Sequence, residues 1–151
     1  MDVDFASLLF GFQGRINRAK YWMALVVYSS VSIAIVGMGF YLQFSVLFFV
    51  TLPILILLMA ISGIAVGIKR LHDRDKTGWW LVPFYLLPPL FDGLTRINGL
   101  SLLFGLASAA VSIWMIVELG FLRGTPGPNQ YGHDPLERRP QNEKPGASRA
   151  F

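Results

Sequence analysis

The chain has 151 residues, of which 54% are hydrophobic and 15% are charged, and it contains no cysteine. A water-soluble domain of this length usually has about a quarter of its residues charged, so the composition excludes an ordinary soluble globule. The absence of cysteine excludes disulfide bonds, thiolate nucleophiles and cysteine-ligated metal centres. The formal net charge of +4 is therefore interpreted as a membrane-topology signal and not as a nucleic-acid-binding face.

The first apolar segment extends from Tyr21 to Ile68 without a single Asp, Glu, Lys, Arg or His. It is long enough for two crossing helices of about 20 residues each. Weak helix formers near Gln43 predict a turn, which gives spans at about 21–42 and 44–68. No small-residue cleavage site follows the first apolar stretch, so we expect the chain to retain its N-terminus.

The third predicted span is short and rich in proline. We place it at about 77–94, at the lower limit of length for a crossing helix, and a re-entrant segment would also fit. The fourth span, at about 100–122, contains Glu118 as its only charged residue. A re-entrant third segment would put the basic C-terminal tail opposite the other basic segments, so four crossings are favoured.

The basic residues cluster on one predicted side of the membrane. Of the 13 Lys and Arg residues, only Arg96 falls between spans three and four, and none falls between spans one and two. Because retained positive charge marks cytoplasmic loops, both termini are predicted to be cytoplasmic. The predicted fold is an all-α, polytopic four-transmembrane-helix bundle over residues 1–135, followed by a disordered cytoplasmic tail at 136–151.

The polar residues concentrate in three predicted cytoplasmic segments, 10–20, 69–80 and 127–135. In the first, Asn17 is a predicted N-cap for span one. In the second, the i,i+3 spacing of Arg70 and Asp73 predicts an ion pair if span two continues as a helix. The third has turn residues throughout, and we expect it to fold back onto the bundle.

We predict that these segments converge in a single cytoplasmic cap, in which Arg15 or Arg18 pairs with Asp73, Asp75 or Asp134. The alternative is a solvated loop that only sets topology. The candidate cap or anionic-lipid contacts are Arg15, Asn17, Arg18, Lys69, Arg70, His72, Asp73, Arg74, Trp79, Trp80, Asn129, Tyr131 and Asp134.

Two ligand hypotheses arise from the same segments. Six cations near the predicted membrane surface indicate attraction to an anionic leaflet and raise the question of a specific phospholipid site. These cations are Arg15, Arg18, Lys20, Lys69, Arg70 and Arg74. A metal site from His72, Asp73, His133 and Asp134 has suitable ligand types but lacks a helical i,i+4 spacing, so we expect no metal or other cofactor.

The three motifs together resemble a known family. They are the Phe-x-Gly-Arg-Ile-Asn-Arg segment with Tyr21 and Trp22, the Lys-Arg-Leu-His-Asp segment with Gly78-Trp79-Trp80, and the Gly-x-Asn-x-Tyr-Gly-x-Asp-Pro tail. In this order around apolar spans, over residues from about 5 to 135, they are similar to the bacterial inner-membrane proteins catalogued as domain of unknown function 805. The resemblance implies a four-helix inner-membrane protein and supplies no catalytic reaction.

The sequence contains no Gly-x-Ser-x-Gly, no paired intramembrane carboxylates and no His-Glu-x-x-His. We therefore expect a non-enzymatic scaffold, accessory or stress-responsive membrane component. The alternative is a small-solute or ion channel or carrier that acts as an oligomer, which the helix-breaking prolines favour. The expected partners are the lipid bilayer, with an anionic phospholipid as a candidate, and a membrane protein or a second copy, but not nucleic acid.

Overall fold

A computed structural model describes residues 5–42, 45–97 and 99–137. Within these ranges the regular elements are all helical, with one isolated β-bridge. They are α1 (Phe5–Phe10), α2 (Arg18–Tyr41), α3 (Val46–Asp73), the 3-10 helix η1 (Gly78–Trp80), α4 (Leu81–Leu94), α5 (Ser101–Ile116) and the π-helix η2 (Val117–Phe121). The predicted turn at Gln43 lies outside the described residues, as do residues 138–151 of the tail predicted to be disordered at 136–151. The first two residues of that tail, Leu136 and Glu137, are instead part of a turn, because their backbone N–H groups donate to Asp134.

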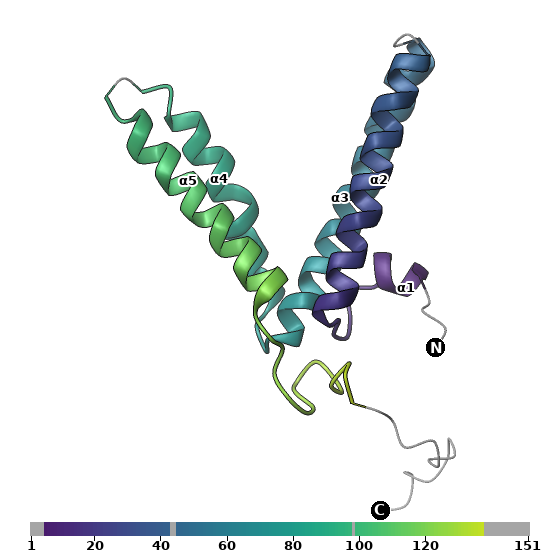
Figure 1. Cartoon of the computed structure of the whole chain (residues 1–151), viewed down its shortest axis with the longest axis vertical. Helices are drawn as coiled ribbons and strands as arrows, with labels where there is room; N and C mark the ends of the chain where they lie inside the picture. The colour runs from purple at the N-terminus through teal and green to yellow at the C-terminus, as the bar shows by residue number, and fades with distance from the viewer. Residues whose placement is uncertain (1–4, 43–44, 98, 138–151) are drawn as a thin grey trace, which may run out of the picture.

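The long helices form two antiparallel hairpins that diverge as the arms of a V (Figure 1). One arm contains α2 and α3, and the other contains α4 and α5. The end of α3, η1 and η2 meet at the vertex, with α1 beside the vertex end of the first arm. Residues 123–137 also lie at the vertex, so the first and last described segments occupy the same end of the molecule.

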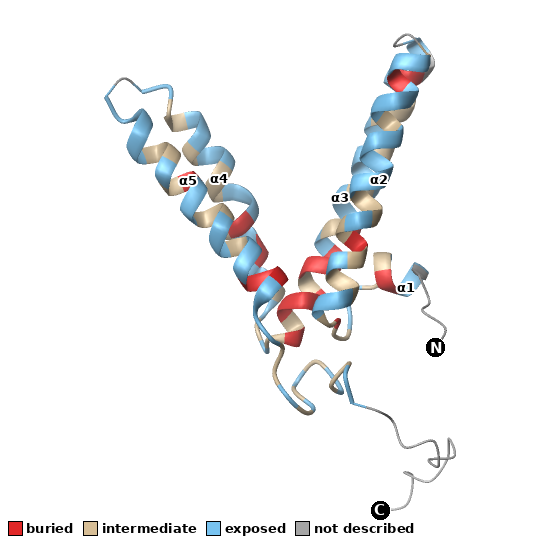
Figure 2. Ribbon diagram, in the orientation of Figure 1, coloured by how far each residue is buried: buried red, intermediate tan, exposed pale blue. Residues whose placement is uncertain are grey.

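Buried residues concentrate near the vertex, whereas most of each arm is exposed (Figure 2). One buried apolar cluster joins α3, α4 and η2 through Leu71, Leu81, Phe84 and Leu119. The other joins α1 to α2 and α3 through Leu8, Ile16, Ala24 and Val66. The arms instead present apolar side chains outward, as expected for helices surrounded by lipid, where exposure of such chains carries no penalty.

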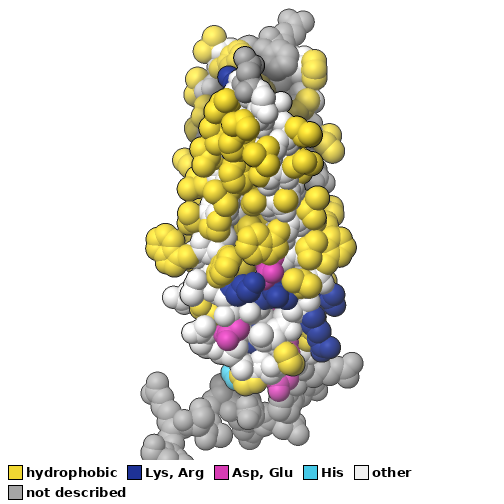
Figure 3. Space-filling model, turned by 90° about the vertical axis from the view of Figure 1, so that its left-hand side faces the viewer, with side chains coloured by type: hydrophobic (Ala, Val, Ile, Leu, Met, Phe, Trp, Pro, Cys, Tyr) yellow, Lys and Arg dark blue, Asp and Glu magenta, His cyan; other side chains and the backbone are white. Residues whose placement is uncertain are grey.

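The exposed side chains are segregated along the molecule (Figure 3). Apolar side chains cover the visible arm, and Lys, Arg, Asp and Glu gather near the vertex end. Three helical segments are long and apolar enough to cross a membrane, namely Arg18–Tyr41, Phe48–Asp73 and Ser101–Phe121. The chain therefore has the helices of a multi-pass membrane protein.

Helix α4, which corresponds to the third predicted span, is shorter than a usual crossing helix. It has 14 residues, which span about 21 Å at about 1.5 Å per residue. The predicted span at 77–94 thus begins as the 3-10 turn of η1 and becomes α-helical only at Leu81. Pro88 and Pro89 lie within α4, and the Ser108 hydroxyl of α5 donates to the Pro88 carbonyl at 3.3 Å.

The helix ends near the vertex explain where the polar residues lie. Asn17 is the N-cap of α2, as predicted, and its Oδ1 accepts a hydrogen bond from the Lys20 backbone N–H at 2.9 Å. Helix α3 continues to Asp73, beyond the predicted limit at residue 68. Residues 69–73 are therefore helical and lie at the vertex, and the chain turns only afterward, where Asp75 has φ 56°.

Candidate functional site

The structure brings the three polar segments together at the vertex. Arg15 comes from the loop before α2, Arg70 and Asp73 from the last turn of α3, and Thr125 and Asn129 from the loop after η2. We call these five residues the polar cap. The backbone joins the same segments, because the Ile16 N–H donates to the Lys69 carbonyl at 3.3 Å.

Arg15 connects all three segments through one guanidinium group. Its Nε and Nη2 donate to Asp73 Oδ1 at 3.3 and 3.2 Å. The same group donates to the carbonyls of Thr125 at 2.6 Å, Gly127 at 2.8 Å and Gly132 at 3.2 Å. The Arg15 side chain is 1% exposed. The N–H donors of its planar guanidinium group therefore find their acceptors inside the protein and not in solvent. Of the predicted partners of Arg15, the structure selects Asp73.

Arg70 is the second buried arginine of the polar cap. Its Nη1 pairs with Asp73 Oδ2, as the i,i+3 spacing predicts. Its Nε donates to the Leu119 carbonyl at 2.7 Å, and Nη2 donates to the Leu122 carbonyl. Asp73 therefore lies between two arginines and uses one oxygen for each. This arrangement fastens the end of η2 to the end of α3 and thereby joins the two arms.

The loop after η2 approaches Asp73 closely. The Thr125 N–H and hydroxyl both donate to the Asp73 carbonyl, at 2.8 and 3.1 Å. A Cβ atom added at Gly124 would collide with the Asp73 carboxylate. Glycine at 124 therefore allows the loop to lie against the buried carboxylate, which is a packing reason that the sequence pattern did not indicate.

The third motif folds back onto α3, as its turn residues predict. Asn129 Nδ2 donates to the His72 carbonyl at 2.9 Å and to Thr125 Oγ1 at 3.0 Å. The Tyr131 ring stacks on the His72 ring with centroids 3.8 Å apart and planes 4° apart. His72 Nδ1 is 3.2 Å from the Gly14 carbonyl. The His72 ring therefore lies between the first and third segments.

Asp134 stabilises the turn of the third motif instead of pairing with an arginine. Its carboxylate accepts hydrogen bonds from the backbone N–H groups of Leu136 at 2.8 Å and Gly127 at 3.2 Å. The Leu136 N–H is the main cause that lowers the pKa of Asp134, and the charges of Arg15 and Arg123 add to it. Among the described residues, Asp134 forms no ion pair within 4.0 Å.

Glu118 forms a second buried ionic cluster, which the sequence did not predict. From near the end of span four, its place in the sequence predicts contact with Arg123 or water. Instead it is 3% exposed in η2, and its Oε1 accepts from Arg74 Nε at 2.6 Å and Lys76 Nζ at 2.7 Å. Arg123 contributes only its carbonyl, which accepts from Arg74 at 3.0 Å. Arg74 and Lys76 lie in the α3–η1 connection, so the Glu118 cluster joins η2 to this connection.

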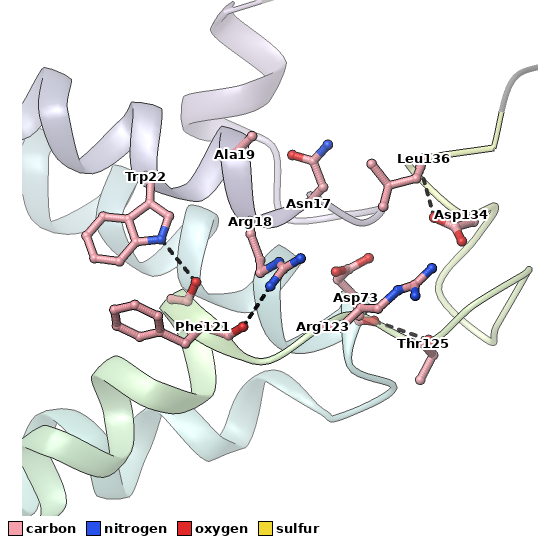
Figure 4. A pocket seen from close by; sticks show the side chains of 12 residues that line it. Asn17, Arg18, Ala19, Trp22, Asp73, Phe121, Arg123, Thr125, Asp134 and Leu136 are labelled. Carbon is pink, nitrogen blue, oxygen red and sulfur yellow. Dashed lines mark hydrogen bonds between the residues drawn. The ribbon is translucent and has the colours of Figure 1, made fainter.

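A cavity of about 430 Å³ lies beside the polar cap, between the start of α2 and the loop after η2. Figure 4 shows Arg18 directed to the Phe121 carbonyl, which accepts from it at 3.0 Å. Trp22 Nε1 donates to the Gly120 carbonyl at 3.0 Å, also drawn there. Arg18 thus contacts a backbone carbonyl and not one of the three predicted carboxylates.

Of the six cations predicted to lie near the membrane surface, three are buried. Side chains of Arg15 and Arg70 are 1% and 0% exposed, and Lys69 is 3% exposed. These three donate to internal carbonyls or to Asp73, so they do not form one exposed basic patch. Lys69 and Arg70 direct donors toward carbonyls near the ends of α1 and η2, where intrahelical partners are missing. Arg15 directs its donors toward Asp73 and the loop after η2.

The two predicted tryptophans lie outside the polar cap. Trp79 is 80% exposed. Trp80 packs edge to face on Trp114 of α5 at 5.8 Å and lies under Lys76 Nζ at 5.2 Å. They are placed at the start of the second arm, where aromatic rings favour the membrane–water boundary.

The remaining candidate chemistry is a metal site. Across residues 5–42, 45–97 and 99–137, no group of three or more His, Cys, Asp or Glu side chains is arranged to hold a metal ion. In the same ranges, every buried side-chain nitrogen or oxygen has a hydrogen-bond partner. The observed contacts of the polar cap are hydrogen bonds and ion pairs between its own segments.

Comparison with known proteins gives a family and relatives of limited identity. Residues 9–133 match the family described as protein of unknown function DUF805. The chain is 28% identical over 126 residues to the Inner membrane protein YhaI of Escherichia coli K12, covering 83% of this chain and 86% of that protein. It is 29% identical over 145 residues to the Inner membrane protein YhaH of the same strain, covering 83% and 87%. No solved structure matches the chain.

Proposed function

Since the chain belongs to the DUF805 family of unknown function, we propose that it is a non-enzymatic scaffold, accessory or stress-responsive component of the inner membrane. The chain is a bacterial inner-membrane protein, as its relatives are named and as its apolar helices require. The proposal concerns what the polar cap does there. Its role is to hold two membrane hairpins in one arrangement that a partner recognises.

The observation that supports this proposal is the internal use of the motif residues. Arg15 and Arg70 donate to Asp73 and to carbonyls of the η2 region and the following loop. A catalytic group must reach its substrate, and an activated nucleophile needs an adjacent base. Residues with these internal contacts instead determine how the arms are joined.

The proposed topology has four crossings with both termini in the cytoplasm. It is supported by the Lys and Arg distribution and by the position of the first and last described segments at one end. The pairing of α4 with α5 along one arm also supports a crossing third segment. Because the chain lacks cysteine, single cysteines at Thr95 and Glu137 can test it by accessibility from each side of the membrane.

The membrane partner of this end is a bilayer surface with anionic phospholipid. Exposed or partly exposed cations near the vertex include Arg18, Lys20 and Arg74. Basic residues near an anionic leaflet each contribute about 1 kcal/mol of attraction. This attraction fits a cytoplasmic vertex and does not by itself define a site for one lipid.

The second candidate function is an oligomeric channel or carrier. The open V favours it, because an apolar cavity of about 500 Å³ lies between α3 and α4, lined in part by Ile64, Ile68, Leu81 and Tyr85. A second copy placed there would close the V. A scaffold needs no such closure.

Two measurements on the full chain separate these candidates. Crosslinking and affinity capture from native membranes should recover a protein partner with the wild type, and recovery should fall with Asp73→Asn but persist with Asp75→Asn. Purified protein in liposomes should pass no ion or small solute faster than empty liposomes do. Reproducible flux by the protein alone would overturn the scaffold role and establish the carrier.

A further inference from the structure

A second cavity near the vertex differs in charge from the one beside the polar cap. It has a volume of about 650 Å³ and lies between α1, the loop before α2, and the adjacent turns of α2 and α3. Among the residues that the structure describes, its lining includes the basic residues Arg15, Lys20 and Lys69 but no Asp or Glu. The cavity beside the polar cap, in contrast, is lined by both cations and carboxylates.

Lys69 is a buried cation of this cavity that has no counter-ion among residues 5–42, 45–97 and 99–137. It is 3% exposed, and its Nζ donates to the carbonyls of Ser7 at 2.7 Å and Leu8 at 2.5 Å. No carboxylate among the described residues forms an ion pair with it. An ammonium group has three N–H donors, so one remains after these two bonds. Because a buried charge without an opposite charge nearby is unfavourable even when it is hydrogen-bonded, an anion in the cavity would stabilise the fold.

Lys20 adds a second charge from α2. It is partly exposed and lines the same cavity. Within the described ranges its side chain has neither an ion pair nor a hydrogen bond, since only its backbone N–H is used, in the cap by Asn17. Gln13 contributes a neutral amide, and Phe12 and Leu8 supply apolar lining. Two ammonium groups beside an amide and an apolar wall suit a phosphate group at the membrane boundary.

We propose that this cavity binds the phosphate group of an anionic ligand, with Lys20 and Lys69 as its cations. The site rests on the proposed membrane role, because the ligand chemistry fits a phospholipid headgroup at the vertex. The same chemistry occurs in a soluble phosphate. A phospholipid differs from a soluble phosphate in having acyl chains. Only the lipid could therefore also contact the apolar side chains of Leu8 and Phe12.

The test is native mass spectrometry of the detergent-solubilised full chain with separate additions of phosphatidylglycerol, phosphatidylcholine and inorganic phosphate. We expect saturable binding of one equivalent of phosphatidylglycerol, weaker binding of phosphatidylcholine, and an affinity about tenfold lower in Lys20→Gln. Lys20→Arg keeps the charge and should bind as the wild type does. Arg123→Gln removes one charge from the other cavity and should change the affinity less than about twofold.

Each outcome bears on the site. Saturable inorganic phosphate binding that Lys20→Gln weakens and Arg123→Gln does not would support the site with a soluble ligand. Absence of saturable binding of any probe, or equal losses in Lys20→Gln and Arg123→Gln, would overturn it. Melting temperatures of the variants are compared first, since Lys20 is partly exposed and its removal should leave the fold intact. The capture and flux measurements do not use this cavity, so failure here leaves the scaffold role standing.

Discussion

The vertex and the arms of the V are stabilised by different interactions. In the arms, apolar side chains face outward, as at Ile33 and Leu102, which are 73% and 75% exposed. At the vertex, two arginines whose side chains are almost unexposed are held by a carboxylate and by carbonyls of η2 and the loop that follows it. Lipid can surround the arms in many relative arrangements. Buried ionic groups, in contrast, are stable only in the few arrangements that keep their hydrogen bonds and ion pairs. The arrangement of the two hairpins is therefore determined mainly at the vertex.

The largest expected effect is that of Asp73→Asn. It removes the charge shared by Arg15 and Arg70, both with side chains at most 1% exposed. Loss of one partner from a buried ionic group costs about 4 kcal/mol. The free energy of unfolding in detergent should fall by this amount. Asp75→Asn is the matched control, because Asn is tolerated at the positive φ of residue 75, and an equal loss there would contradict the assignment.

The next effect is steric. Gly124→Ala places a methyl group against the Asp73 carboxylate, and such overpacking costs about 3 kcal/mol. The control is Gly105→Ala in an arm, where an added Cβ has no heavy atom within 4 Å. The melting temperature should fall only in Gly124→Ala. A similar fall in both variants would show that the vertex is no more tightly packed than the arm.

Glu118→Gln tests the second ionic cluster. The change removes the charged partner of Arg74 and Lys76, whose side chains are 20% and 31% exposed. Because these cations can still reach water, we expect a loss of about 2 kcal/mol, less than for Asp73. Chemical denaturation measures it, with exposed Asp92→Asn near the far end of the second arm as the control. A loss larger than that of Asp73→Asn would reverse the ranking of the two clusters.

A smaller effect is expected where the third motif covers α3. Tyr131→Leu removes the ring that stacks on His72 at 3.8 Å, which should cost about 1 kcal/mol. Tyr131→Phe keeps the ring that stacks on His72 and should retain wild-type stability. Thermal unfolding distinguishes the two. Equal losses would assign the effect to the hydroxyl and not to stacking.

The smallest effect is a dependence on pH in the exposed turn. The folded state lowers the pKa of Asp134 below its ordinary value of 3.8. The ionised carboxylate therefore stabilises the turn above that value, and the stabilisation is lost as the pH falls through the lowered pKa. Protection of the Gly127 and Leu136 amides from hydrogen exchange should decrease in acid in the wild type. In Asp134→Asn this protection should change less with pH. Protection that rises in acid would contradict this sign.

The helices could be predicted from sequence because a bilayer requires long uncharged segments and satisfied backbone groups. The Asn17 cap and the Arg70–Asp73 pair depend on residues close in sequence and were also predictable. The return of the third motif to α3 followed from its turn residues. In each case a local pattern determines the outcome.

Features that depend on distant segments could not be predicted in the same way. Glu118 pairs with Arg74 and Lys76, which are 44 and 42 residues away in the sequence, and no local signal indicates the π-helix η2 that carries it. The choice of Asp73 over Asp134 by Arg15 depends on how the last turn of α3 meets the loop. The burial of Lys69 likewise depends on α1 packing over it.

The most direct test of the central claim measures the distance between the arms. Because the chain lacks cysteine, spin labels can be attached at Ile33→Cys and Leu102→Cys, one on each arm, without removing native thiols. Pulsed electron paramagnetic resonance in nanodiscs should give one narrow distance distribution for the labelled protein with no further change and with Asp75→Asn. With Asp73→Asn the distance distribution should be broad. A distribution that stays narrow and unshifted with Asp73→Asn would show that the polar cap does not set the arrangement of the hairpins.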